Sequence, residues 1–170
     1  MDSDEQYPAL AGFRAAVSRF AQGVAVLTTV DVDGTPHGVT VGSFIPLSKR
    51  PPLLGVALDR RAGILPIITA AGRFAVNVLD EGAEETSALF ATKGVDRFAA
   101  VPWTLGTHGL PLLSEHATSV VECRVERTSD GGDHVIVVGG VLAARPLGER
   151  SPLVYSGRRY FGIRSVAVAR

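Results

Sequence analysis

The chain has 170 residues, enough for one domain, and 46% of them are hydrophobic while 20% are charged, which excludes a disordered protein. Seventeen basic residues balance seventeen acidic ones, so no overall charge favours nucleic acid or a membrane surface as a partner. The first residues lack the pattern of a signal peptide, and no apolar run is long enough for a membrane helix. We therefore expect a cytoplasmic protein that binds neither nucleic acid nor membranes.

The first half of the chain predicts one helix followed mainly by strands. Apolar residues recur at helical spacing, which predicts an amphipathic helix over residues 9–21. Runs of β-branched residues and turn signals then predict strands over residues 24–30 and 38–44, a loop over 46–50, a strand over 53–58, a short helix over 63–71 and a strand over 73–79.

The second half continues this pattern after a long irregular excursion. It predicts a short helix over residues 84–92, a loop-rich stretch over 93–111, strands over 118–127 and 134–145, and a last strand near Tyr155 or over 160–163. Six or seven strands with two or three short helices favour a mainly β fold, a closed or nearly closed antiparallel barrel, because closure removes exposed edges. We expect a flexible tail over residues 1–10 and a single domain over 11–170.

Several common catalytic motifs are absent from the sequence. There is no G-x-G-x-x-G, no phosphate-binding P-loop, no G-x-S-x-G and no H-E-x-x-H. The four histidines and the single Cys123 show no metal-ligand spacing, so we expect no metal site. The absence of these motifs argues against a hydrolase and against a metalloenzyme. If the protein uses a nicotinamide cofactor, it binds that cofactor without a Rossmann motif.

Short motifs follow one another in a characteristic order from about residue 11 to 163. They include Gly23-Val-Ala-Val-Leu-Thr-Thr29, Ser48-x-x-Pro51-Pro52, Phe74-Ala-Val-Asn-Val-Leu79, Gly132-Asp133-His134 and Tyr155-x-Gly157-x-x-Tyr160. In this order and spacing the chain resembles the flavin reductase-like family, the small reductases of two-component flavin monooxygenases. The resemblance implies an FMN-binding split barrel with a few short helices.

The resemblance also implies an activity and partners. The protein would be an NAD(P)H:flavin oxidoreductase that transfers hydride from NADH or NADPH to FMN or FAD. It would release the reduced flavin to a partner monooxygenase, and it would form a homodimer with its sites near the subunit interface.

Residues in four segments match positions that contact flavin in this family. The segment at the end of the second strand offers two hydroxyls, a glycine and an aromatic ring, although an ordinary barrel strand is also compatible with it. The stretch after the third strand combines positive charge with the free N–H groups of a helix start, which suits a phosphate or a diphosphate. The matching residues are Thr40, Val41, Gly42, Ser43, Phe44, Ser48, Arg61, Ala62, Gly63, Phe90 and Ala91.

Three further residues match positions near the nicotinamide in this family. His134 could hydrogen-bond the dinucleotide or manage protons, and Asp133 could orient its ring; a histidine that simply begins a strand is the alternative. Tyr160 could line the same pocket, or it could pack the last strand.

Three other interpretations of the chain stay open at this point. A flavoprotein of the same fold could keep FMN tightly bound and act on another small molecule. A non-catalytic flavin-binding protein would bind flavin without turnover, and a purely structural barrel would bind none.

Overall fold

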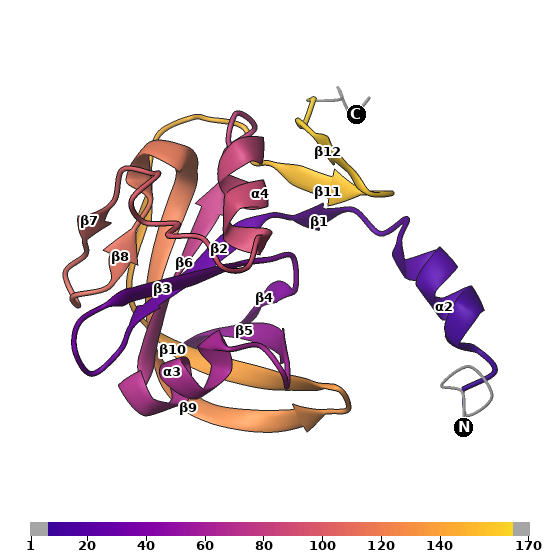
Figure 1. Ribbon diagram of the computed structural model, residues 1–170, viewed down its shortest axis with the longest axis horizontal. Coiled ribbons are helices and arrows are strands. Elements are labelled where there is room, and N and C mark those ends of the chain that lie inside the picture. Colours follow the sequence, from indigo (N-terminus) through magenta and orange to yellow (C-terminus); the bar gives the residue numbers. More distant parts are fainter. Residues whose placement is uncertain (1–6, 165–170) are drawn as a thin grey trace.

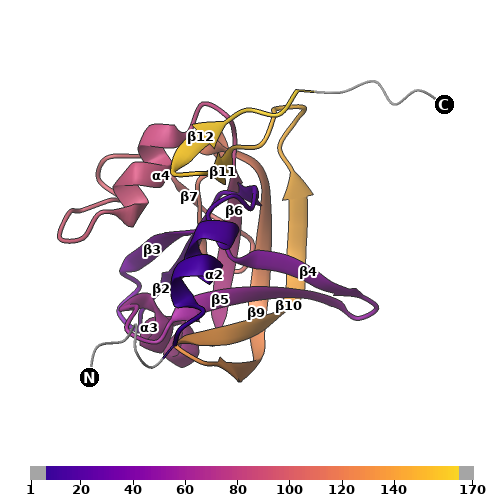
Figure 2. The ribbon, with the colours of Figure 1, turned by 90° about the vertical axis from the view of Figure 1, so that its right-hand side faces the viewer.

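The computed structural model describes residues 7–164, and their main element is a sheet of seven antiparallel strands in the order β3-β2-β6-β9-β10-β5-β4. The mainly β class expected from the sequence is confirmed, and Figures 1 and 2 show this sheet curling around itself. The strands are β2 Ala25–Val30, β3 Pro36–Val41, β4 Phe44–Lys49, β5 Pro52–Asp59, β6 Arg73–Leu79, β9 Ala117–Gly131 and β10 His134–Pro146.

The barrel is open between β3 and β4, the two ends of the strand order. The chain crosses this gap at residues 42–43, and the Ser43 hydroxyl donates to the Ala57 carbonyl oxygen at 2.6 Å. The sequence prediction was wrong here, because one strand over 38–44 and a loop over 46–50 are in fact two strands. β4 is an edge strand, so it tolerates Pro46, which has no N–H to donate to a neighbouring strand. The pairing of β4 with β5 shifts register between Pro46 and Ser48.

The main hydrophobic core lies between the curled sheet and helix α3 (Ile64–Ala71), which follows β5. Leu27, Val56, Ile68 and Phe74 are all at most 1% exposed, so strands distant in sequence share one core. A second buried cluster lies beneath helix α4 (Glu84–Ala91) and includes Phe90 and Leu153. The two helices therefore cover different parts of the sheet and leave a hollow between them.

Two small sheets complete the described part of the chain. β1 (Gln22–Gly23), β11 (Val154–Ser156) and β12 (Arg159–Phe161) form the first, so the single last strand that we predicted is a hairpin of two. β7 (Thr104–Leu105) and β8 (Pro111–Leu112) form the second within the excursion after α4, and a 3-10 turn, η1 (Ser114–His116), follows.

Helix α2 (Leu10–Val17) projects from the barrel (Figure 1). The amphipathic helix predicted over residues 9–21 is present but shorter, and none of its residues is buried. Phe13 is 64% exposed and Phe20, just beyond the helix, is 68% exposed. The apolar face that the sequence predicts is therefore uncovered in the single chain.

Among the helices that the structure describes, none combines the length and the apolar character needed to cross a membrane.

Candidate functional site

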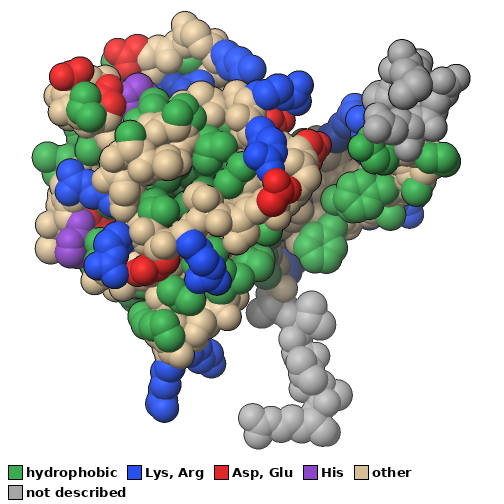
Figure 3. Space-filling model, turned by 90° about the horizontal axis from the view of Figure 1, so that it is seen from below, with side chains coloured by type: hydrophobic (Ala, Val, Ile, Leu, Met, Phe, Trp, Pro, Cys, Tyr) green, Lys and Arg blue, Asp and Glu red, His purple; other side chains and the backbone are tan. Residues whose placement is uncertain are grey.

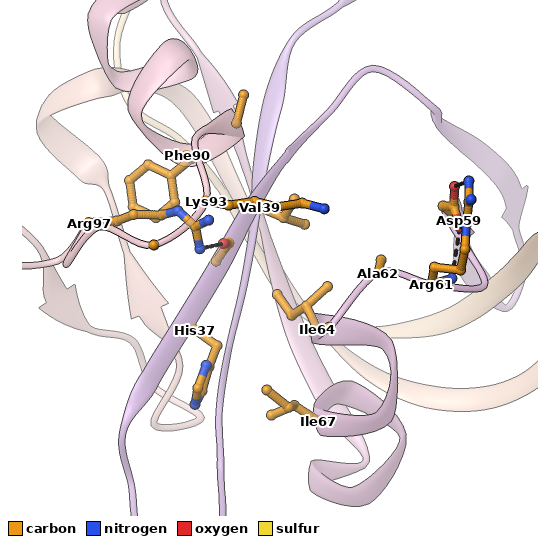
Figure 4. A pocket seen from close by; sticks show the side chains of 14 residues that line it. His37, Val39, Asp59, Arg61, Ala62, Ile64, Ile67, Phe90, Lys93 and Arg97 are labelled. Carbon is orange, nitrogen blue, oxygen red and sulfur yellow. Dashed lines mark hydrogen bonds and ion pairs between the residues drawn. The ribbon is translucent and has the colours of Figure 1, made fainter.

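A cavity of about 890 Å³ lies between β3, the start of α3 and the end of α4 (Figure 4). Its walls are apolar where Val39, Ile64, Ile67 and Phe90 line it. Basic side chains from three separate segments also line it, and Asp59 is the one carboxylate among its lining residues. An apolar cavity with a few polar groups is the usual form of a small-molecule site, and its positive charge favours an anionic ligand.

The α3 side of the cavity contains the predicted phosphate segment, since Arg61, Ala62 and Gly63 all line it. Arg61, however, is already bound to protein: Nε donates to Asp59 Oδ1 at 3.2 Å and the terminal nitrogen donates to Asp59 Oδ2 at 3.0 Å. The Arg61 side chain and backbone N–H hold the pKa of Asp59 down to about 2, and the Asp59 carboxylate raises the pKa of Arg61. This ion pair forms part of the cavity rim, as Figure 4 shows.

The α4 side of the cavity contains the predicted pair Phe90 and Ala91. Phe90 is fully buried and meets Phe98 edge-on, with ring centroids 5.2 Å apart. Gly38 permits this packing, because a Cβ atom there would lie 2.6 Å from Cε1 of Phe90. The absence of a side chain at Gly38 therefore shapes this wall of the cavity.

The segment from Thr40 to Phe44 lies where β3 ends and β4 begins, and none of its residues lines the cavity. The Thr40 hydroxyl donates to the Ser87 carbonyl oxygen at 2.6 Å, so it attaches β3 to α4. Gly42 faces the Gln22 side chain, whose Oε1 would lie 2.6 Å from an added Cβ atom. In the single chain this segment therefore holds the end of β3 against α4 and the start of β4 against β5.

Ser48 lies on the edge strand β4, also away from the cavity lining. Its hydroxyl accepts the N–H of Arg50 at 3.2 Å, which supports the turn into β5.

Asp133 and His134 lie at the turn between β9 and β10. His134 Nδ1 is 2.7 Å from the Asp133 carboxylate, which is the orienting contact expected from the sequence. His134 pairs in register with Asp59 of β5, so this turn adjoins the Asp59–Arg61 rim of the cavity. Both side chains have access to solvent, with exposed fractions of 43% for His134 and 89% for Asp133.

Tyr160 lies far from this turn in the single chain. Its hydroxyl is 2.9 Å from the Ser87 hydroxyl on α4, and its ring packs against the buried cluster beneath that helix. The small sheet that carries Tyr160 and the β9–β10 turn lie at opposite ends of the molecule in Figure 1. Within one chain Tyr160 and His134 therefore do not meet.

Three basic residues of the cavity were not predicted as site residues. His37 lines it from β3 and is 2.9 Å from the Asp31 carboxylate, and Lys93 and Arg97 line it from the loop after α4. For Lys93, the sequence did contain a signal that could have predicted a site residue, because Lys93 follows the predicted Phe90–Ala91 pair by two residues. Arg97 gives no comparable signal, because only the tertiary structure brings it to the Gly38 carbonyl oxygen, 3.0 Å from its Nη1 atom.

Residues 17–164 match the model of a family described as flavin reductase like domain. The chain is 43% identical over 150 residues to "Flavin reductase (NADH)" of Kitasatospora aureofaciens, covering 87% of this chain and 78% of that protein. It is 35% identical to "Flavin-dependent monooxygenase, reductase subunit HsaB" of Rhodococcus jostii (strain RHA1), covering 89% of this chain and 76% of the relative. Its fold is similar, with a TM-score of 0.84, 34% identity and 94% coverage of each chain, to the Streptomyces globisporus C-1027 NADH:FAD oxidoreductase SgcE6 in complex with NAD and FAD fragments.

Proposed function

The chain belongs to the flavin reductase-like family, and from this premise we propose that it reduces FMN or FAD with NADH or NADPH and releases the reduced flavin to a monooxygenase. The observation that carries the proposal is the cavity between α3, α4 and β3, with its apolar walls and basic rim. We expect the reaction to take place in the cytoplasm, where reduced nicotinamide dinucleotides are available.

The residues around the cavity fit a flavin. Its volume, about 890 Å³, is in the range of roughly 300–1,000 Å³ that small-molecule sites occupy. Val39, Ile64 and Ile67 offer apolar contact for the ring system, and the start of α3 offers backbone N–H groups to a phosphate. A bound flavin would supply the redox chemistry by accepting hydride from the nicotinamide.

The protein's contribution is to bind and orient the two reactants. Arg61–Gly63 are proposed contacts of the phosphate within the cavity. Thr40–Phe44 and Ser48 are proposed flavin contacts at the end of β3 and on β4, outside the cavity lining of the single chain. His134, held by Asp133, is proposed to hydrogen-bond the dinucleotide at the rim that it shares with Asp59. Placement of the reactants within about 3–3.5 Å of each other is the main catalytic requirement, so no acid or base is needed for hydride transfer itself.

We further propose that two copies of this chain form a dimer through α2 and β4. Phe13 and Phe20 are 64% and 68% exposed, and Ile45 and Leu47 on β4 are 57% and 42% exposed. Figure 3 shows hydrophobic side chains gathered on the arm that projects from the barrel. A dimer would bury this apolar surface, and it would bring a second chain to the strand ends that carry the proposed flavin contacts Thr40–Phe44 and Ser48.

A steady-state assay tests the proposed activity. Purified protein is mixed with each flavin and each dinucleotide, and the loss of reduced nicotinamide absorbance is followed. Turnover that depends on added flavin supports a reductase that releases its flavin. A protein that purifies yellow and has no such activity would instead be a flavoprotein with bound FMN, and flavin binding without turnover under any donor would indicate a carrier.

A further inference from the structure

A second cavity, of about 420 Å³, lies between the β7–β8 hairpin and strands β9 and β10. It shares no lining residue with the cavity between α3 and α4, and its hairpin lies at the edge of the barrel away from α2 (Figure 1). Val121 and Cys123 of β9 face the main core, so the alternate residues Val120 and Glu122 face this second cavity. Its volume is sufficient for a small molecule.

Glu122 is a buried carboxylate in the wall of this cavity, with only 4% of the residue exposed. Its Oε1 atom accepts the backbone N–H of His108 at 2.9 Å, which anchors the β7–β8 turn. Among the residues that the structure describes, Oε2 has no hydrogen-bond partner and Glu122 forms no ion pair. Oε2 is nevertheless accessible, because the described buried side-chain atoms that lack both solvent and a partner are Ser114 Oγ and His116 Nε2. This oxygen is therefore open to a ligand in the cavity.

The protein does not supply the positive charge that a buried carboxylate usually has beside it. Arg73 on the neighbouring strand β6 uses Nη1 to donate to the His108 carbonyl oxygen at 3.1 Å. Gly106 leaves space next to the carboxylate, since a Cβ atom there would lie 2.5 Å from Glu122 Oε1. A ligand with a positively charged N–H donor would thus complete the surroundings of Glu122.

Arg145 brings a positive charge to the same cavity from β10. In the β9–β10 ladder Arg145 pairs with Val120 while Glu122 pairs with Ala143, so the two charged side chains are diagonal neighbours on one face of the sheet. Within the described part of the chain, Arg145 forms no ion pair with Glu122 or with any other residue. A carboxylate and a guanidinium that do not neutralise each other match a ligand that carries both an ammonium and a carboxylate.

The remaining lining of the cavity is largely apolar. It comes from the hairpin and from both strands, and it consists of Leu105, Leu112, Val120, Ala143 and Ala144. Such a lining suits the side chain of a ligand whose charges are bound by Glu122 and Arg145.

We propose that this cavity binds a free α-amino acid with an apolar side chain. Glu122 Oε2 accepts the ammonium group, Arg145 donates to the carboxylate, and no covalent bond forms. The inference goes beyond the proposed reductase function and does not depend on it, because neither residue lines the flavin cavity.

Isothermal titration calorimetry with three related probes tests the two charge contacts separately. L-leucine carries both charges, N-acetyl-L-leucine lacks the ammonium, and L-leucinamide lacks the carboxylate. We expect L-leucine to bind with a Kd of about 1 mM, and each of the other two to bind about tenfold more weakly, as for the loss of one charge-assisted contact.

Variants of the protein should match these probes one by one. Glu122→Gln keeps an acceptor for the His108 N–H, and we expect it to weaken L-leucine binding about tenfold. Arg145→Gln should weaken L-leucine binding by a similar factor and leave that of L-leucinamide unchanged. The matched controls are Glu126→Gln and Arg124→Gln, which remove one charge each from β9 outside the cavity and should change neither affinity.

The outcomes distinguish this inference from the proposed function. Absence of L-leucine binding, equal binding of all three probes, or unchanged L-leucine affinity in Arg145→Gln would overturn the amino-acid site and leave the reductase activity untouched. If Glu122→Gln did not fold, N-acetyl-L-leucine would still test the ammonium contact on the unaltered protein. Loss of flavin reduction in the unaltered protein would overturn the proposed function alone.

Discussion

Arg60 donates a hydrogen bond from Nε to the backbone oxygen of Gly132, with an N···O distance of 2.6 Å. Its backbone N–H also donates to the Asp133 carbonyl oxygen at 3.0 Å, and its terminal nitrogen pairs with Asp130. Arg60, the residue just after β5, thus holds the β9–β10 turn through three contacts. This turn carries His134, and the neighbours of Arg60, Asp59 and Arg61, line the cavity, so Arg60 links the cavity to the proposed dinucleotide contact.

Replacement of Arg60 should therefore affect the dinucleotide more than the flavin. We expect Arg60→Ala to raise KM for the dinucleotide about threefold to tenfold, because one or two net hydrogen bonds that position the turn are lost. Arg60→Lys should recover part of this loss, and FMN affinity should stay the same in both variants. Steady-state kinetics and flavin titration measure the two effects, and equal changes in both would contradict a positioning role.

His134 itself should be required for use of the dinucleotide. We expect His134→Ala to impair turnover with NADH or NADPH more than it weakens flavin binding, because the imidazole is exposed at the rim and its partner is Asp133. The measurement is a comparison of kcat/KM for the dinucleotide with Kd for FMN. Unchanged kinetics would remove His134 from the mechanism.

Gly38 should be intolerant of any side chain. A Cβ atom there would lie 2.6 Å from the Phe90 ring and 3.3 Å from that of Phe98, both on the side of α4. We expect Gly38→Ala to lower the free energy of unfolding by about 1–3 kcal/mol through overpacking, and to weaken flavin binding as the wall shifts. Urea unfolding measures the first effect; an unchanged midpoint would mean that the ring moves freely.

The proposed dimer should depend on the apolar arm. We expect the double variant Phe13→Ser with Phe20→Ser to sediment as a monomer, because it removes the two most exposed large apolar side chains on and beside α2. Val32→Ser is a suitable control, since Val32 is 90% exposed but lies at the β2–β3 turn. Sedimentation equilibrium of the unaltered protein at the mass of one chain would contradict the proposed dimer.

Asp59 should contribute to the acid dependence of stability. Its pKa is lowered to about 2 in the folded chain, chiefly by the Arg61 side chain, from about 3.9 in an unfolded chain. The ion pair is therefore fully stabilising above about pH 4, and its contribution is lost as the pH falls through about 2.

The free energy of unfolding of Asp59→Asn should accordingly change less with pH in this acidic window than that of the unaltered protein. Urea unfolding at a series of pH values measures this difference. Asp33→Asn provides the control, because Asp33 forms no ion pair among the described residues and should follow the unaltered protein. An identical slope in Asp59→Asn and the unaltered protein would contradict the assignment.

Local sequence patterns determined most of the elements of this fold. Runs of β-branched residues and turn signals predicted β6 over Arg73–Leu79 with the bounds that the structure has, and they predicted β9 and β10 to within a few residues. These features depend on side chains close in the sequence, because strand period and turn geometry are local properties. The order of short motifs likewise identified the family, since it is a property of the sequence alone.

Only the tertiary structure decided which side chains meet. Pairing of β5 with β10 brings Asp59 next to His134, and the packing of α3 and α4 on the same sheet brings Lys93 to the cavity rim that Arg61 shares. No local pattern contains such contacts, because each joins residues more than thirty positions apart. For the same reason the sequence predicts that α2 has an apolar face, but only the packed chain leaves that face uncovered.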